Sequence, residues 1–126
     1  MINIVLVDDE TDMFPVFNVK FKREIRDGKV KFHFFTSAQD ALEFVSESKG
    51  DKFDYIISDI NMPAMTGFDL ASQIKKDNSK QKVVLISSTN LEESKDYDPD
   101  IGIDGYVHKP INFDELKRLL LDREKK

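Results

Sequence analysis

Several short apolar runs in this sequence are followed at once by a side chain that could take part in a reaction. They are Asp8 and Asp9 after residues 2–7, Asp59 after residues 55–58, Ser87 after residues 82–86, and Lys109 after residues 105–108. Carboxylates that lie close together repel one another, and they stay ionised together only if a cation joins them or their pKa values rise. Oxygen ligands without histidine or thiolate suit Mg²⁺, so the acids predict a bound magnesium ion.

The other two groups, Lys109 and Ser87, limit which reactions this site could carry out. Lys109 supplies an ammonium and Ser87 a hydroxyl, but no histidine or paired base is placed to make Ser87 a nucleophile. The reacting group is therefore expected to be a carboxylate, and aspartyl phosphate is an established covalent intermediate. A metal ion and a lysine beside the transferred phosphoryl oxygens would supply the stabilisation that this chemistry needs.

Apolar patterns predict that strands alternating with helices position these groups. Strands are expected over residues 2–7, 30–35, 55–59, 82–87 and 105–108, and helices from about Asp12 to Asp27, from the N-cap Ser37 to near Gly50, after Thr66 and Gly67, and after the N-cap Asn112. Between Leu91 and Ile101 the chain is mostly charged and contains Pro99, so a helix there should be short or irregular.

This alternation predicts an α/β fold, a doubly wound five-stranded parallel sheet with helices on both faces. The carboxyl ends of parallel strands share one edge of the sheet, and ligands bind there. The polar groups that follow the strands should therefore meet at one edge.

Composition limits the class of protein. We expect residues 1–126 to form one domain, and a net charge of -5 argues against direct nucleic-acid binding. The absence of cysteine excludes disulfides and thiolate metal sites. With no cationic leader and no apolar run of membrane-spanning length, we expect a cytoplasmic protein without a membrane segment.

With these motifs the sequence resembles the receiver domains of two-component response regulators. The matching parts are Asp8 and Asp9, residues 59–67, Ser87 after an apolar strand, and residues 105–110. The resemblance covers nearly the whole chain and implies the flavodoxin-like strand order 2-1-3-4-5. It also implies that a histidine kinase or phosphotransfer protein phosphorylates Asp59, which switches a surface that binds a downstream protein of unknown identity.

The resemblance implies a set of metal ligands as well. Asp9, Asp59 and the backbone carbonyl of Asn61 would bind Mg²⁺ directly. Asp8 would act mainly through a water molecule.

The resemblance also implies how neighbouring residues respond to phosphorylation. A phosphoryl group would change the charge at Asp59 from about -1 to about -2 and draw Ser87 and Lys109 toward its oxygens. Ser87 would be the switch hydroxyl, and Tyr106 the aromatic residue that changes rotamer with it. The bond between Lys109 and Pro110 would be cis.

Two other functions compete with this interpretation. A Mg²⁺-dependent phosphatase could work through an aspartyl intermediate, but the haloacid dehalogenase type needs a second acid two residues after the nucleophile, where this chain has Asn61. A constitutive interaction module of the same fold would generally lack part of the acid set, which is intact here. The phosphoacceptor interpretation is therefore the leading hypothesis.

Overall fold

The computed structural model of the protein describes residues 1–48, 53–88 and 98–121. Its strands are β1 (Ile2–Val7), β2 (Val30–Phe35), β3 (Tyr55–Asp59), β4 (Val83–Ser87) and β5 (Gly105–His108). Its helices are α1 (Met13–Lys20), α2 (Lys22–Arg26), α3 (Ala38–Glu47), α4 (Gly67–Asp77) and α5 (Phe113–Leu121), with a 3-10 helix η2 (Pro99–Ile101).

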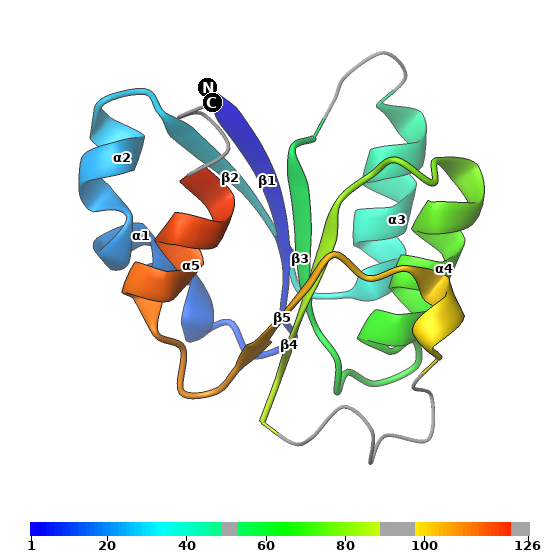
Figure 1. The fold of residues 1–126 in the computed structure, drawn as a ribbon. Helices are drawn as coiled ribbons and strands as arrows, with labels where there is room; N and C mark the ends of the chain where they lie inside the picture. Colours follow the sequence, from blue (N-terminus) through cyan, green and yellow to red (C-terminus); the bar gives the residue numbers. More distant parts are fainter. Residues whose placement is uncertain (49–52, 89–97, 122–126) are drawn as a thin grey trace.

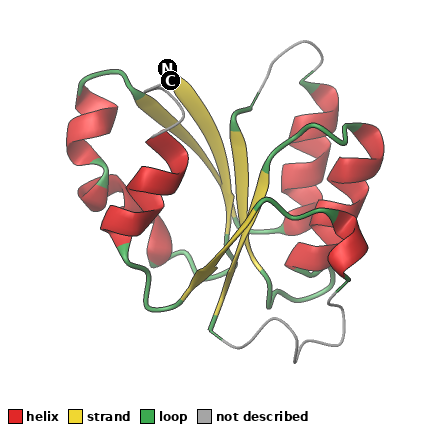
Figure 2. Cartoon of the chain, viewed as in Figure 1, coloured by secondary structure: helices red, strands yellow, loops and turns green. Residues whose placement is uncertain are grey.

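The strands form one parallel sheet in the order β2-β1-β3-β4-β5. Helices α1, α2 and α5 cover one face, and α3, α4 and η2 cover the other (Figure 1), so the sheet is the middle layer in Figure 2. The predicted fold class and strand order are confirmed, and the strand bounds agree with the prediction to within one residue. Among the described residues, no helix is both long and apolar enough to cross a bilayer.

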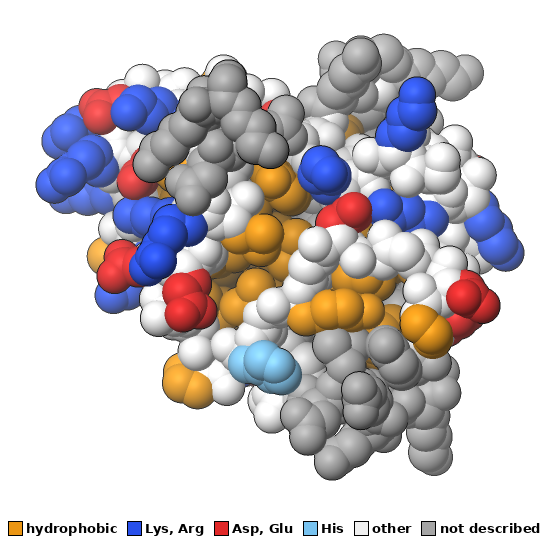
Figure 3. All heavy atoms as spheres, viewed as in Figure 1, with side chains coloured by type: hydrophobic (Ala, Val, Ile, Leu, Met, Phe, Trp, Pro, Cys, Tyr) orange, Lys and Arg blue, Asp and Glu red, His pale blue; other side chains and the backbone are white. Residues whose placement is uncertain are grey.

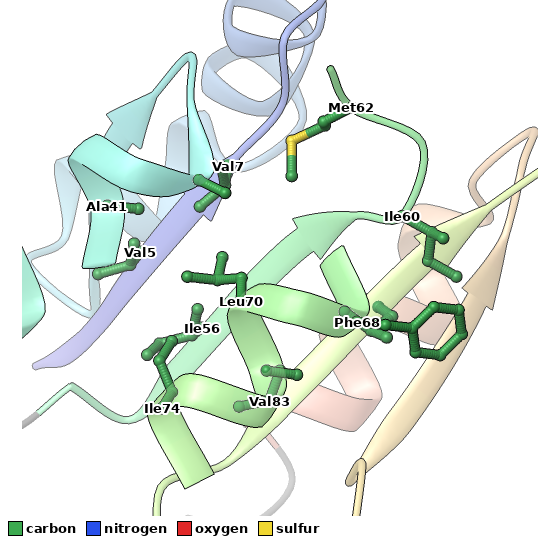
Figure 4. Packing of buried hydrophobic residues seen from close by; sticks show 13 residues of the cluster. Val5, Val7, Ala41, Ile56, Ile60, Met62, Phe68, Leu70, Ile74 and Val83 are labelled. Atoms are coloured by element: carbon green, nitrogen blue, oxygen red, sulfur yellow. The ribbon is translucent and has the colours of Figure 1, made fainter. Parts of the chain in front are cut away.

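The central strands are the most deeply buried part of the fold. Every residue of β3 and β4 is buried, and in β1 only Asn3 is half-buried. A hydrophobic cluster lies on each side of the sheet, and Figure 4 shows the cluster on the side of α3 and α4. Burial on both faces explains why these strands are continuous apolar runs in the sequence.

The structure corrects one prediction, because the helix expected over residues 12–27 is broken at Phe21. This residue has φ -104° and ψ 17° and separates α1 from α2. Hydrogen bonds of 2.9 Å cross the break, from Phe21 N to Phe17 O and from Ile25 N to Phe21 O. The Phe21 side chain is fully buried, and its ring meets Phe32 edge-on. The bend thus accompanies the packing of this ring into the core.

The predicted helix starts carry the expected caps. Ser37 Oγ accepts a hydrogen bond from Asp40 N at 3.1 Å, and Asn112 Oδ1 accepts one from Glu115 N at 3.2 Å. Each bond satisfies an amide of the first turn that has no partner within its helix.

Two predictions fall partly outside the described ranges. The helix end predicted near Gly50 lies in residues 49–52, and the described α3 ends at Glu47. Of the segment between Leu91 and Ile101, only residues 98–101 are described, and they form η2 with Pro99 at its start. This part agrees with the prediction of a short or irregular helix.

The start of α4 packs directly against the end of β3. Thr66 and Asp69 form a capping box, and Gly67 N donates to Ile60 O at 3.0 Å. A β-carbon at Gly67 would lie only 2.5 Å from the carbonyl oxygen of Asp59. Glycine therefore permits the close approach that fixes the chain on both sides of the loop after Asp59.

Replacing Gly67 by alanine should lower the free energy of unfolding by about 2–3 kcal/mol, because the added methyl group must displace backbone atoms. Gly105→Ala is the matched control, since its β-carbon would meet only side-chain atoms, the nearest at 3.4 Å. Urea unfolding of both variants measures the difference. Equal stability of the two variants would contradict the close-approach argument.

Candidate functional site

The parallel sheet brings the chemically capable side chains to one edge. Asp8 follows β1, Asp59 ends β3, Ser87 ends β4 and Lys109 follows β5. These strands are neighbours in the sheet and run in the same direction. All four residues therefore lie at the carboxyl edge, where ligands bind in folds of this kind.

Three acids form a cluster at this edge. Carboxylate oxygens of Asp8, Asp9 and Asp59 all lie within 4.8 Å of one another. Asp8 and Asp59 are 3% and 4% exposed, whereas Asp9 is open to solvent. Glu10 N donates to Asp8 Oδ1 at 2.9 Å and so fixes that carboxylate. An all-oxygen donor set that is open on one side fits a hard divalent cation such as Mg²⁺.

Lys109 supplies a positive charge to the cluster. Its Nζ lies 3.6 Å from Asp59 Oδ2 and 4.0 Å from Asp8 Oδ2. Its backbone N donates to Ser87 O at 2.9 Å, and its peptide bond to Pro110 is cis. One ammonium therefore faces two buried carboxylates, and it neutralises their repulsion only in part.

Burial dominates the electrostatics of the two buried acids. Loss of solvation raises the pKa of Asp59, and the charge of Asp9 adds to the rise, while Lys109 and the backbone amide of Asn61 oppose it. Burial also raises the pKa of Asp8, and the nearby charge of Asp59 contributes to the increase. The ionised cluster is thus unfavourable unless a further cation joins it.

The two residues expected to switch lie on neighbouring strands. Ser87 is buried, and it lies beside His108 of β5 in the strand register. Tyr106 is half-buried beside Leu85 and packs against the hydrophobic cluster on the side of α3 and α4. The Tyr106 ring therefore contributes to packing whether or not it changes rotamer.

The loop after Asp59 contains a feature that the sequence analysis did not single out. Asn61 is exposed, and its backbone amide acts to lower the pKa of the Asp59 carboxyl, against the larger effect of burial. Ala64 has φ 67°, the only positive φ at a non-glycine residue in the described ranges. Alanine does not favour this conformation, so the neighbouring Pro63 was the only sequence signal of a turn here.

Sequence comparison finds related proteins over most of the chain. The profile of the response regulator receiver domain matches residues 4–121. The heme response regulator HssR of Staphylococcus epidermidis is 33% identical over 116 residues, which cover 92% of this chain and 48% of that protein. The chain thus spans about half the length of this curated relative.

Solved structures with the same fold include several response regulator proteins. A response regulator receiver domain protein from Clostridium thermocellum has a TM-score of 0.81 at 20% identity, with 99% of this chain and 98% of that chain covered. Response regulator TrrA of Thermotoga maritima, solved in complex with Mg²⁺-BeF, has a TM-score of 0.76 at 28% identity, with 97% and 98% covered. The first likeness, at 20% identity, shows the fold alone.

At pH 7 and without divalent cations, Asp59→Asn should raise the free energy of unfolding by about 1 kcal/mol, because it removes a buried charge. The folded state raises the pKa of Asp59 above its ordinary value of 3.8. Ionisation therefore lowers stability as the pH rises from the ordinary pKa through the folded pKa, and the penalty is absent below that window.

Urea unfolding between acidic and neutral pH measures this effect. Asp77→Asn, at an exposed position of α4, is the control for the loss of a carboxylate away from the acid cluster. A wild-type protein more stable than Asp59→Asn at pH 7 would rule out the electrostatic penalty.

Proposed function

The chain belongs to the family of response regulator receiver domains, and from this premise we propose that it is the phosphoacceptor of a two-component system. Asp59 would take a phosphoryl group from a histidine kinase or a phosphotransfer protein. The observation that carries the proposal is the placement of Lys109 Nζ 3.6 Å from a buried Asp59 within a cluster of three acids. This set offers a nucleophile, a cation and metal ligands in one place.

The residues of the site have distinct tasks in this reaction. An Asp59 carboxylate oxygen attacks the phosphorus atom, and the bond from phosphorus to the donor's leaving group breaks, with the electron pair going to the leaving group. Lys109 stabilises the negative charge on the transferred phosphoryl oxygens. Asp8, Asp9 and Asp59, with the backbone carbonyl of Asn61, would hold Mg²⁺. When bound, this ion supplies further positive charge at the phosphoryl oxygens.

Phosphorylation would change the contacts of neighbouring residues. The charge at Asp59 would increase from about -1 to about -2, spread over three acceptor oxygens. Ser87 and Lys109 would be attracted to those oxygens. Because they lie at the ends of β4 and β5, their movement would alter the packing of Tyr106.

The surface between β5 and α5 is the proposed binding site of a downstream protein. A groove of ≈ 370 Å³ lies there, and it is lined by both apolar and polar residues: Tyr106, Val107, His108, Pro110, Asn112, Glu115, Leu116 and Leu119. Figure 3 shows hydrophobic side chains in the middle of this face. A change at Tyr106 would therefore change the shape of a groove of mixed polar and apolar character on the protein surface.

Acetyl phosphate should add one phosphoryl group to the wild-type protein in the presence of Mg²⁺ and none to Asp59→Ala. Without Mg²⁺ the modification should be much slower, because the acids repel the incoming phosphate. Mass spectrometry of the intact protein measures the product, and Asp77→Ala is the matched control at an exposed site. A phosphoryl group retained in Asp59→Ala would remove this assignment.

Asp9→Ala should weaken Mg²⁺ binding at least about tenfold, since it removes one carboxylate of the donor set. Isothermal titration calorimetry measures the affinity. Asp12→Ala removes another exposed acid, at the N-cap position of α1, and serves as the control for general electrostatic effects. Undiminished affinity in Asp9→Ala would show that the metal site lies elsewhere.

A further inference from the structure

The loop that joins β3 to α4 is held at several points. Near its start, Ile60 N donates to Ile86 O of β4 at 3.0 Å. At its end, Gly67 N donates to Ile60 O at 3.0 Å. Met62, within the loop, is only 8% exposed and joins the hydrophobic cluster on the side of α3 and α4 (Figure 4). The loop therefore has little freedom to change its path.

The chain reverses at Ala64, between these points. Met65 N donates to Pro63 O at 2.8 Å across Ala64, whose φ is 67°. A three-residue turn with positive φ at its centre is rare and strained for a residue with a β-carbon. The side chain of Ala64 is exposed, so a larger side chain would not meet the core. The backbone conformation alone therefore limits which residues fit at this position.

We propose that Ala64 is a positioning residue for the metal site, because its positive-φ turn fixes the path of the loop that carries Asn61. This inference rests on the function proposed above, in which Asp59 and the backbone carbonyl of Asn61 would bind Mg²⁺. Met62 and Met65 on either side of the turn pack against the same hydrophobic cluster. Packing of buried Met62 and partly buried Met65 maintains a strained conformation that the loop would otherwise leave.

The proposal has a consequence for Mg²⁺ affinity. The apparent affinity of a protein for a ligand falls with the fraction of molecules in the binding-competent conformation. A residue that resists positive φ reduces that fraction, and a residue that tolerates positive φ preserves it. Affinity should therefore follow the conformational preference of residue 64 and not the size of its side chain.

Ala64→Val and Ala64→Asn provide the test, because the two side chains are similar in size but only asparagine tolerates positive φ well. Titration calorimetry with Mg²⁺ should show an affinity roughly five- to tenfold weaker for the valine variant. The asparagine variant and Ala64→Gly should stay within about twofold of the wild type. Ala64→Thr, which is also β-branched, repeats the test if the valine variant does not fold.

A control separates this effect from a general loss of stability. Gly28 has φ 72° in the turn before β2, and no atom lies within 4 Å of the place where its β-carbon would be. Gly28→Val therefore introduces the same kind of strain away from the site. It should lower the urea midpoint, measured without Mg²⁺, but leave Mg²⁺ affinity unchanged.

Equal Mg²⁺ affinity in Ala64→Val, Ala64→Asn and the wild type would overturn the proposal. A loss in Ala64→Gly as large as that in Ala64→Val would also overturn it, because the methyl group and not the turn would then matter. Failure of the wild-type protein itself to bind Mg²⁺ would instead reject the function proposed above. The two failures are thus distinguishable.

Discussion

The carboxylates of Asp8 and Asp59 are buried close together and repel each other, and the rest of the structure must offset this repulsion. Burial raises the pKa of both groups, and a single ammonium, on Lys109, lies 3.6 and 4.0 Å from them. The strands that carry the acids are hydrogen-bonded neighbours and are packed on both faces. The backbone that carries the acids is therefore held in place at the carboxyl edge of the sheet. The hydrophobic core stabilises an arrangement that is electrostatically unfavourable.

The geometry around Asp59 depends on the backbone at least as much as on side chains. Gly67 lets α4 start against the end of β3, and Ala64 reverses the chain within the loop between them. Lys109 is fixed in a similar way, because its N–H donates to Ser87 O on the adjacent strand. Such constraints leave the Asp59 backbone little freedom of position, as the proposed phosphoryl transfer would require for catalysis by proximity and preorganised charge.

Much of the fold could be predicted from the sequence because its signals are local and mutually consistent. Apolar runs identified the buried strands, and Ser37 and Asn112 identified helix starts, since each signal reports the environment of a few adjacent residues. The break at Phe21 was not predictable, because Phe17, Phe21 and Ile25 keep helical spacing whether or not the helix bends. The turn at Ala64 was missed for a related reason: tertiary contacts impose it on a residue that does not favour it. Topology predicted that the site residues share an edge, but the distances between their charges depend on packing.

The unfavourable electrostatics of the acid cluster are also what would make it responsive in the proposed function. A ligand shifts a conformational equilibrium only to the extent that it interacts differently with the two states. If Lys109 and a second fixed cation neutralised the acids completely, neither a metal ion nor a phosphoryl group would find uncompensated charge to change. Because repulsion persists between Asp8, Asp9 and Asp59, the proposed addition of a metal ion or a phosphoryl group would alter the balance of forces on Ser87, at the end of β4, and on Lys109, which follows β5. The cost in stability and the capacity to respond therefore have the same physical origin.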